Sequence, residues 1–299
     1  MVESVAREMA ELEDEDFYLL SGVEHGMRFS EWVKVGKITE FSRLNREEVE
    51  YRVDRTLDRG LIERNTIQYT GYKLTTKGYD ALALHTFVER ETLRGFGAPL
   101  GVGKESDVFE VQSYKPLALK FHREGYTNFR EVMKEREYTA DKEHTSWLYT
   151  ARKAAEREFD ILEALYPDVS VPRPIDHNRH AIVMEKMDGI ELSKANIDPD
   201  NVQPLLERIL TEVMNAYEMG YVHADLSEYN IFVSDSEVTV FDWPQGVSTE
   251  HNNATELLQR DVQNIIDYFD RKYPDSLPSL DPQNITAAII DGEFKRVHE

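Results

Sequence analysis

Residues 221–233 have the sequence Tyr-Val-His-Ala-Asp-Leu-Ser-Glu-Tyr-Asn-Ile-Phe-Val. Apolar residues enclose His223, Asp225 and Asn230 on both sides, and a polar loop between two apolar anchors is how a scaffold holds functional groups at the edge of its core. The strand-like segment 238–241 is followed by Asp242, a second candidate metal ligand after Asn230. An ordinary solvated loop would explain His223 and Asp225 alone, but the addition of Asn230 and Asp242 at these separations favours a functional site.

The spacing within this loop, His-x-Asp followed by Asn five residues after the Asp, matches the catalytic loop of protein kinases. In that loop the aspartate faces the attacking hydroxyl, and the asparagine turns back to a metal ion. Asp225 and Asn230 are therefore the first candidates for catalysis and metal binding.

The segment 100–111 has the pattern of a strand, a glycine turn and a second strand. It is not a Walker A loop, because Lys104 is followed by Glu105 and the required upstream glycine is Ala98. It fits the kinase glycine-rich loop with Ser106 in place of the third glycine. Glycines in such a loop let backbone amides approach phosphates without a Cβ in the way.

Two further segments match the nucleotide-binding half of a kinase. Lys120 ends a short apolar strand, as the lysine of the kinase V-A-I-K motif does. A strand-end lysine that extends its amine to solvent is the structural alternative. The segment 151–165 predicts an amphipathic helix on which Glu158 stands where kinases place the partner of that lysine, and Glu156 is the competing candidate.

The segment 181–185 predicts a buried strand, and residues 185–189 after it resemble the hinge between kinase lobes. A helix is expected over 202–220, ahead of the catalytic loop, and another over 254–273. Asp261 on the latter is either buried against the catalytic loop or exposed to solvent. The chain has no Ala-Pro-Glu motif after Asp242, so we expect no conventional activation segment.

Residues 1–90 predict a winged-helix domain. Helices are expected over 14–24, 29–35 and 38–43, and a capped helix starts at Asn45, with Glu48 three residues later, and ends at Gly60. A hairpin of strands 67–69 and 72–74 and a helix over 75–88 complete the expected pattern.

The capped helix carries several arginines, of which Arg52, Arg55 and Arg59 share one face by their spacing. In a winged helix this element reads a nucleic-acid groove. The same helix carries five carboxylates, so a solvated face of mixed charge is an equally good interpretation.

Composition limits the surroundings of the protein. The net charge of −22 argues against a surface that binds nucleic acid everywhere, although it does not exclude a local basic face. An acidic surface adapted to a salty cytoplasm is one explanation, because salt screens its self-repulsion. The chain has no cysteine, no apolar run of membrane-spanning length and no signal-like start, so we expect a cytoplasmic protein without a membrane partner.

Together these residues resemble the RIO family of atypical serine/threonine protein kinases, in its type-2, winged-helix-bearing branch, of archaeal kind. The segments that carry the resemblance are 101–106, 119–122, 223–230, 241–245 and 260–265. The resemblance implies an α+β chain with a winged helix over 1–90 and a truncated two-lobed kinase over 91–299. The kinase would comprise an N-lobe at about 91–185, a hinge at 185–189 and a C-lobe at about 190–299.

The resemblance also implies roles for residues. Lys120 would hold the phosphates of ATP, Glu158 would orient Lys120, and Asp225 would be the catalytic aspartate. Asn230 and Asp242 would bind Mg²⁺, or Mn²⁺, and Asp242 would also accept a phosphoryl group. The expected nucleotide contacts are Gly101, Val102, Gly103, Lys104, Glu105, Ser106, Val108, Ala118, Lys120, Glu158, Met184, Glu185 and Met187.

The function implied by the resemblance is a kinase or ATPase that acts in maturation of the small ribosomal subunit. Its winged helix would bind ribosomal RNA or the precursor particle, and removal of residues 1–90 should then leave ATP hydrolysis largely intact. The alternatives are a small-molecule phosphotransferase, which shares the catalytic-loop spacing, and a DNA-binding regulator with a nucleotide-sensing domain.

Overall fold

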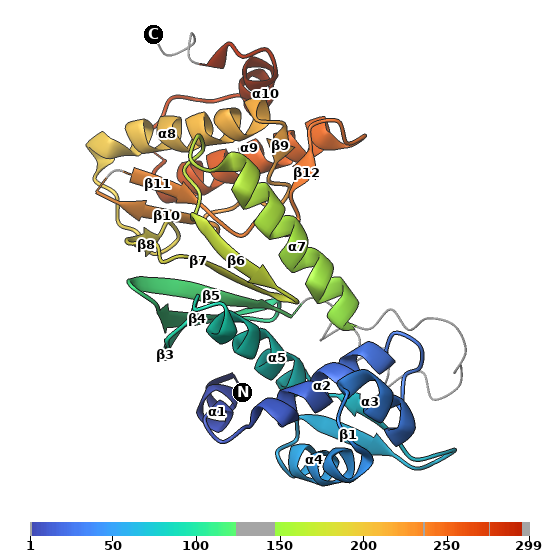
Figure 1. Ribbon diagram of the computed structural model, residues 1–299. Helices are drawn as coiled ribbons and strands as arrows, with labels where there is room; N and C mark the ends of the chain where they lie inside the picture. The colour runs from blue at the N-terminus through green and yellow to red at the C-terminus, as the bar shows by residue number, and fades with distance from the viewer. Residues whose placement is uncertain (1, 124–146, 236, 275, 295–299) are drawn as a thin grey trace. The chain divides into compact units, whose positions relative to one another are not determined.

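The computed structural model describes residues 2–123, 147–235, 237–274 and 276–294 (Figure 1). The chain forms two compact units. The first comprises Met1–Arg152 with Asn178–Ala181, and the second comprises Lys153–His177 with Ile182–Glu299. Among the residues described, the helices are all too short or too polar to cross a membrane.

The first unit begins with the expected winged helix. Helix α4 starts after Asn45, whose side chain accepts the N–H of Glu48 at 2.9 Å, and it stops just before Gly60, which has a φ of +66°. Local capping chemistry thus fixes both ends of the helix, as predicted. The elements are α1 (Val2–Met9), α2 (Asp14–Gly26), α3 (Val35–Ser42), α4 (Arg46–Asp58), β1 (Ile62–Asn65), β2 (Gly71–Leu74) and α5 (Thr76–Glu89).

Two predictions for this domain are wrong. Residues 29–34 are not helical, because the backbone of Val33 exchanges hydrogen bonds of 2.8 and 2.9 Å with Tyr72 beside the hairpin. The first strand of the hairpin is Ile62–Asn65 rather than 67–69. The Asn65 side chain accepts the N–H of Ile67 at 2.8 Å, which turns the chain there and leaves Ile67 exposed.

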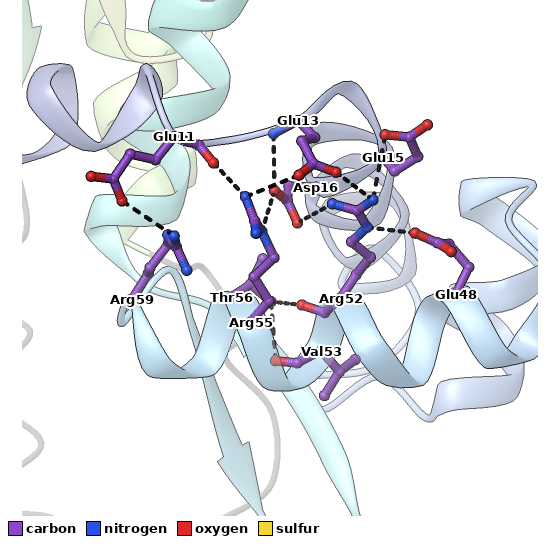
Figure 2. Close-up of polar contacts among 10 residues, drawn as sticks. All are labelled: Glu11, Glu13, Glu15, Asp16, Glu48, Arg52, Val53, Arg55, Thr56 and Arg59. Atoms are coloured by element: carbon purple, nitrogen blue, oxygen red, sulfur yellow. Dashed lines mark hydrogen bonds and ion pairs between the residues drawn. The ribbon is translucent and has the colours of Figure 1, made fainter.

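Arg52, Arg55 and Arg59, at the C-terminal half and end of α4, do share a face, but this face lies against the acidic segment that leads into α2 (Figure 2). Arg52 is buried and lies 2.6 Å from Glu48, 2.7 Å from Glu13 and 3.3 Å from Asp16. Burial lowers the pKa of Arg52, but the hydrogen bonds to these carboxylates outweigh it, and the pKa is raised.

The neighbouring arginines have acidic partners too. Arg55 contacts Asp16 at 2.9 Å, and Arg59 contacts Glu11 at 3.3 Å. All three arginines are therefore paired with carboxylates of the chain itself, and binding of nucleic acid by the winged helix stays a prediction.

The first unit also contains the three strands that carry the glycine turn. Strands β3 (Gly95–Val102), β4 (Ser106–Gln112) and β5 (Pro116–His122) form an antiparallel sheet in that order. Phe109, Leu119 and Phe121 lie buried on one face, because side chains alternate along each strand. Lys120 points to the opposite face and pairs in register with Val108. The polar insertion that the sequence indicates over 122–150 lies mostly outside the described residues.

The second unit positions the catalytic loop. Helix α8 ends at Glu218, one turn before the loop, and its buried face includes Leu206, Ile209 and Leu210. Strand β10 follows the loop and pairs with both β11 and β8. The remaining elements are α7 (Trp147–Leu165), which begins in the first unit, β6 (Pro174–Asn178), β7 (Ala181–Glu185), β8 (Ile190–Glu191), α8 (Pro199–Glu218), β9 (Tyr221–Val222), β10 (Ile231–Ser234), β11 (Glu237–Val240), β12 (Val247–Ser248), α9 (Ala254–Lys272) and α10 (Pro282–Ile290).

Candidate active site

Side chains of helix α9 hold the backbone of the catalytic loop. The carboxylate of Asp261 accepts the backbone N–H of Ala224 at 2.7 Å and that of Leu226 at 3.0 Å. Burial raises the pKa of Asp261, while the His223 ring and these two N–H groups oppose the rise. Asp225 lies between the two bonded residues and is exposed. The two bonds therefore set the backbone on which the Asp225 side chain is presented, and the buried alternative for Asp261 is confirmed.

Two neighbours of Asp261 on α9 also bond the loop, and the sequence analysis did not identify them. Arg260 donates to the carbonyl of Ala224, and the Asn264 amide donates to the carbonyl of Leu226 at 3.0 Å. Asn264 is four residues after Arg260 and three after Asp261, so it lies beside both on the helix surface. That spacing was the available signal.

His223 ties the start of the loop to the end of strand β11. Its ring is buried, its Nε2 lies 3.0 Å from the carbonyl oxygen of Phe241, and its centroid is 4.6 Å from the ring of Trp243. Asp242, which follows Phe241, has a φ of +70°, and Ala224, which follows His223, has a φ of +65°. Non-glycine residues in this region are uncommon and concentrate at functional sites.

Asn230 and Asp242 lie at the same end of the β10–β11 hairpin. Ile231 pairs with Val240, and the N–H of Phe241 continues the ladder by donating to the carbonyl of Asn230 at 3.0 Å. The Asn230 side-chain amide donates to the carbonyl of Asp225 at 2.9 Å, which turns its own oxygen the other way.

This donor set fits Mg²⁺, which takes hard oxygen ligands and usually keeps water and phosphate oxygens in its shell. In the described part of the chain, no group of three His, Asp or Glu side chains gathers around a metal site. Asn230 and Asp242 would therefore share the ion with the nucleotide.

The structure distinguishes the two glutamates of α7. Glu158 is 1% exposed, and one of its carboxylate oxygens lies 3.3 Å from the backbone nitrogen of Trp243. Glu156 is exposed and forms a 2.6 Å ion pair with Lys153. Glu158 is thus the candidate that reaches the site, through the residue that follows Asp242. Its pairing with Lys120 remains a prediction.

The predicted phosphate loop is an open hairpin turn in the first unit. Residues 101–105 are exposed, the N–H of Gly103 donates to the carbonyl of Ser106 at 2.8 Å, and a Cβ on Gly101 would meet no atom within 4 Å. Lys120 is buried on the same sheet face as Val108 and Ala118. The turn, the lysine and two small apolar residues are therefore available together, as a nucleotide site requires.

The hinge prediction falls on the end of strand β7 and the irregular segment 186–189 after it. Met184 is buried, while Glu185 and Met187 are half-buried. Gly189 has a φ of +116°, and a Cβ there would lie 2.5 Å from the carbonyl oxygen of Val233. Only glycine fits this position. The sequence analysis placed residue 189 in the hinge but did not show that a glycine is required there.

The loop, the hairpin-borne aspartate and the buried glutamate together define a phosphotransferase of the protein-kinase class. Comparison with known families agrees with this class. The family model described as "RIO domain" matches residues 107–282, and the family model described as "Rio2, N-terminal" matches residues 9–90.

Individual relatives agree as well. The RIO-type serine/threonine-protein kinase Rio2 of Methanocaldococcus jannaschii is 42% identical over 254 residues, covering 83% of this chain and 93% of that protein. The serine/threonine-protein kinase rio2 of Schizosaccharomyces pombe is 37% identical, covering 91% and 80%.

A solved structure resembles the whole fold. The Rio2 kinase–ADP/Mg²⁺–phosphoaspartate complex from Chaetomium thermophilum has a TM-score of 0.82 and 32% identity, covering 95% of this chain and 89% of that chain. The chain belongs to the RIO family of serine/threonine protein kinases, in its Rio2 branch. It is thus a protein kinase that uses ATP with Mg²⁺.

Proposed function

We propose that the chain works as a protein kinase and ATPase in maturation of the small ribosomal subunit, with Asp225 as the catalytic aspartate. The observation that carries the catalytic part is the double anchoring of the loop backbone by Asp261 on either side of Asp225. Lys120 and residues 101–106 hold the phosphates of ATP, and Asn230 and Asp242 hold Mg²⁺. The bound ion supplies stabilisation of negative charge on the phosphates.

Asp242 is in this proposal also the acceptor of the phosphoryl group. A carboxylate oxygen of Asp242 bonds to the γ-phosphorus, the bond from that phosphorus to the bridging oxygen of ADP breaks, and ADP leaves. Water then cleaves the acyl phosphate and releases inorganic phosphate. The phosphoaspartate in the Chaetomium thermophilum complex supports this reaction.

The test is incubation with γ-labelled ATP followed by measurement of label and of phosphate release. In wild type we expect label that hydroxylamine removes. Asp242→Asn should carry none, whereas Asp225→Ala should bind ATP normally and turn over about 10²–10⁴-fold more slowly, the usual effect of removing a positioned acid–base group. Hydroxylamine-labile label in Asp242→Asn would contradict the proposal.

The ribosomal part of the proposal rests on a different face of the winged helix from the one that the sequence indicated. Lys34 lies 4.6 Å from the ring centre of Tyr69. Lys73 lies 4.4 Å from that of Trp32 but is already paired with Glu63 at 3.1 Å and Glu31 at 3.6 Å, so Lys34 is the basic group that this face offers to a phosphate. Trp32 and Tyr69 line a pocket of about 300 Å³ beside Ile67, which is 90% exposed. Aromatic rings next to basic groups suit unpaired RNA bases and their phosphates.

Sedimentation with small-subunit particles tests this part. The double variant Lys34→Glu/Tyr69→Ala should lose association, and Arg59→Gln should not, because Arg59 already pairs with Glu11. Full association of the double variant would exclude this face as the RNA-binding surface.

A further inference from the structure

Arg123 connects the phosphate-loop region to the winged helix within the first unit. It lies three residues after Lys120 and is buried. Its backbone N–H donates to the carbonyl of Glu105 at 2.6 Å, and its Nε donates to Asp107 at 2.8 Å. Glu105 and Asp107 are the two neighbours of Ser106, at the return of the glycine turn. Arg123 therefore contacts the phosphate loop through both its backbone and its side chain.

The other end of the Arg123 side chain bonds helix α5 of the winged helix. Its two terminal nitrogens donate to the two carboxylate oxygens of Asp80 at 2.7 and 2.9 Å. This bidentate geometry fixes the plane of the guanidinium as well as its position. Asp80 is completely buried, and its Oδ1 lies 2.8 Å from Nε2 of His180.

The charges in this cluster favour the ion pair between Arg123 and Asp80. Burial raises the pKa of Asp80, but the charge of Arg123 and the hydrogen bonds from His180 and Arg123 outweigh it, so that the pKa is lowered. Burial lowers the pKa of His180. Asp80 is the acidic partner of Arg123 on the winged-helix side, with its Oδ1 2.7 Å from the guanidinium.

The winged helix holds a second element of the same unit nearby. Arg179, in the turn between β6 and β7, has its Nη2 2.7 Å and its Nε 3.0 Å from the carboxylate of Glu24 on α2. Its neighbour in the turn is His180, the hydrogen-bond partner of Asp80. Two acidic residues of the winged helix thus bond the kinase domain: Glu24 bonds Arg179 in the β6–β7 turn, and Asp80 bonds His180 in the same turn and Arg123 after β5.

We propose that Asp80 is a positioning residue for ATP, which holds the glycine turn in its phosphate-binding shape through Arg123. The inference rests on the proposed role of residues 101–106 in phosphate binding. It makes the winged helix a part of the nucleotide site's support. It also reverses the expectation from sequence that removal of residues 1–90 leaves ATP hydrolysis largely intact, because removal leaves the buried Arg123 cation without Asp80.

The experiment measures equilibrium affinity for ATP with Mg²⁺ in the full chain, together with turnover at saturating ATP. Asp80→Asn keeps the shape of the side chain and removes the charge. We expect its ATP affinity to fall about 5- to 30-fold, the range for residues that couple two sites, with a smaller change in turnover. Amide hydrogen exchange at residues 101–106 should become faster.

Asp16→Asn is the matched control. Asp16 is also a completely buried aspartate of the winged helix that bonds two arginines, Arg52 and Arg55, and those arginines are in the same domain. Its substitution should lower stability without changing ATP affinity or exchange in the glycine turn. Asp107→Asn provides a second variant in case Asp80→Asn does not fold, since it releases the loop side of Arg123 and leaves the Asp80 pair intact.

Three outcomes decide the matter. Reduced ATP affinity in Asp80→Asn, with normal affinity in Asp16→Asn, supports the proposal; if Asp80→Asn does not fold, Asp107→Asn takes its place in the comparison. Affinity within twofold of wild type in the folded Asp80→Asn, or in Asp107→Asn where that variant replaces it, overturns the proposal, as does an equal loss in Asp16→Asn. Lys120→Ala tests the proposed nucleotide site separately. Unchanged ATP affinity in that variant would refute the proposed phosphate contacts rather than the role of Asp80.

Discussion

Replacing Asp261 with Asn tests whether the catalytic loop is held in place from helix α9. Asparagine retains one carbonyl oxygen, so it can accept the N–H of either Ala224 or Leu226, and it presents an NH₂ group to the other. Hydrogen bonds to charged groups are worth about 1.5–3 kcal/mol each. One of the two is lost, so the loop should be less well fixed by about 1.5–3 kcal/mol.

This loss should appear in turnover more than in binding, because Asp225 lies between the two bonded residues. At about 1.4 kcal/mol for each factor of ten, turnover at saturating ATP should fall by about 10- to 150-fold. ATP affinity should be nearly unchanged, since the predicted phosphate contacts of residues 101–106 do not involve α9. Phosphate release and equilibrium nucleotide binding measure the two quantities.

Asp267→Asn is the control on the same helix, because Asp267 is exposed and accepts a hydrogen bond of 2.6 Å from the side-chain amide of Gln263, away from the catalytic loop. It should retain wild-type turnover and stability. If Asp261→Asn is folded and its turnover stays within about twofold of wild type, the two N–H bonds do not position Asp225.

Three more results are expected. Asp16→Asn should lower the free energy of unfolding by up to about 3 kcal/mol in denaturant, because Arg52 and Arg55 lose a buried charge partner; a change below 0.5 kcal/mol would contradict this. The pKa of His180 in the folded chain lies below its ordinary value of 6.5. As the pH falls below 6.5, the unfolded chain therefore binds a proton at His180 that the folded chain does not bind. The free energy of unfolding then declines by at most about 1.4 kcal/mol per pH unit. His180→Gln should make unfolding less dependent on pH between 7.5 and 5.5, and an undiminished dependence would exclude His180 as the cause. Gly189→Ala should lower thermal stability, because its Cβ meets the Val233 carbonyl, and an unchanged melting temperature would refute this.

The sequence predicted the features that depend on neighbours along the chain. The catalytic loop was recognisable because Asp225 and Asn230 must be presented from one short loop, so their spacing is fixed. The ends of α4 followed from Asn45 and Gly60, whose effects reach only a few residues. The first strand of the hairpin was misplaced, because the Asn65 side chain, and not an apolar alternation, decides where the chain turns.

Only the tertiary structure decided what each predicted face contacts. Periodicity put Arg52 and Arg55 on one side of α4, but their partner Asp16 lies 36 and 39 residues away in the chain. The same limit applies to Asp80 and Arg123, which are 43 residues apart. A helix repeat specifies which side chains point together, whereas the cost of burying a charge is met only by whichever opposite charge the fold brings to it.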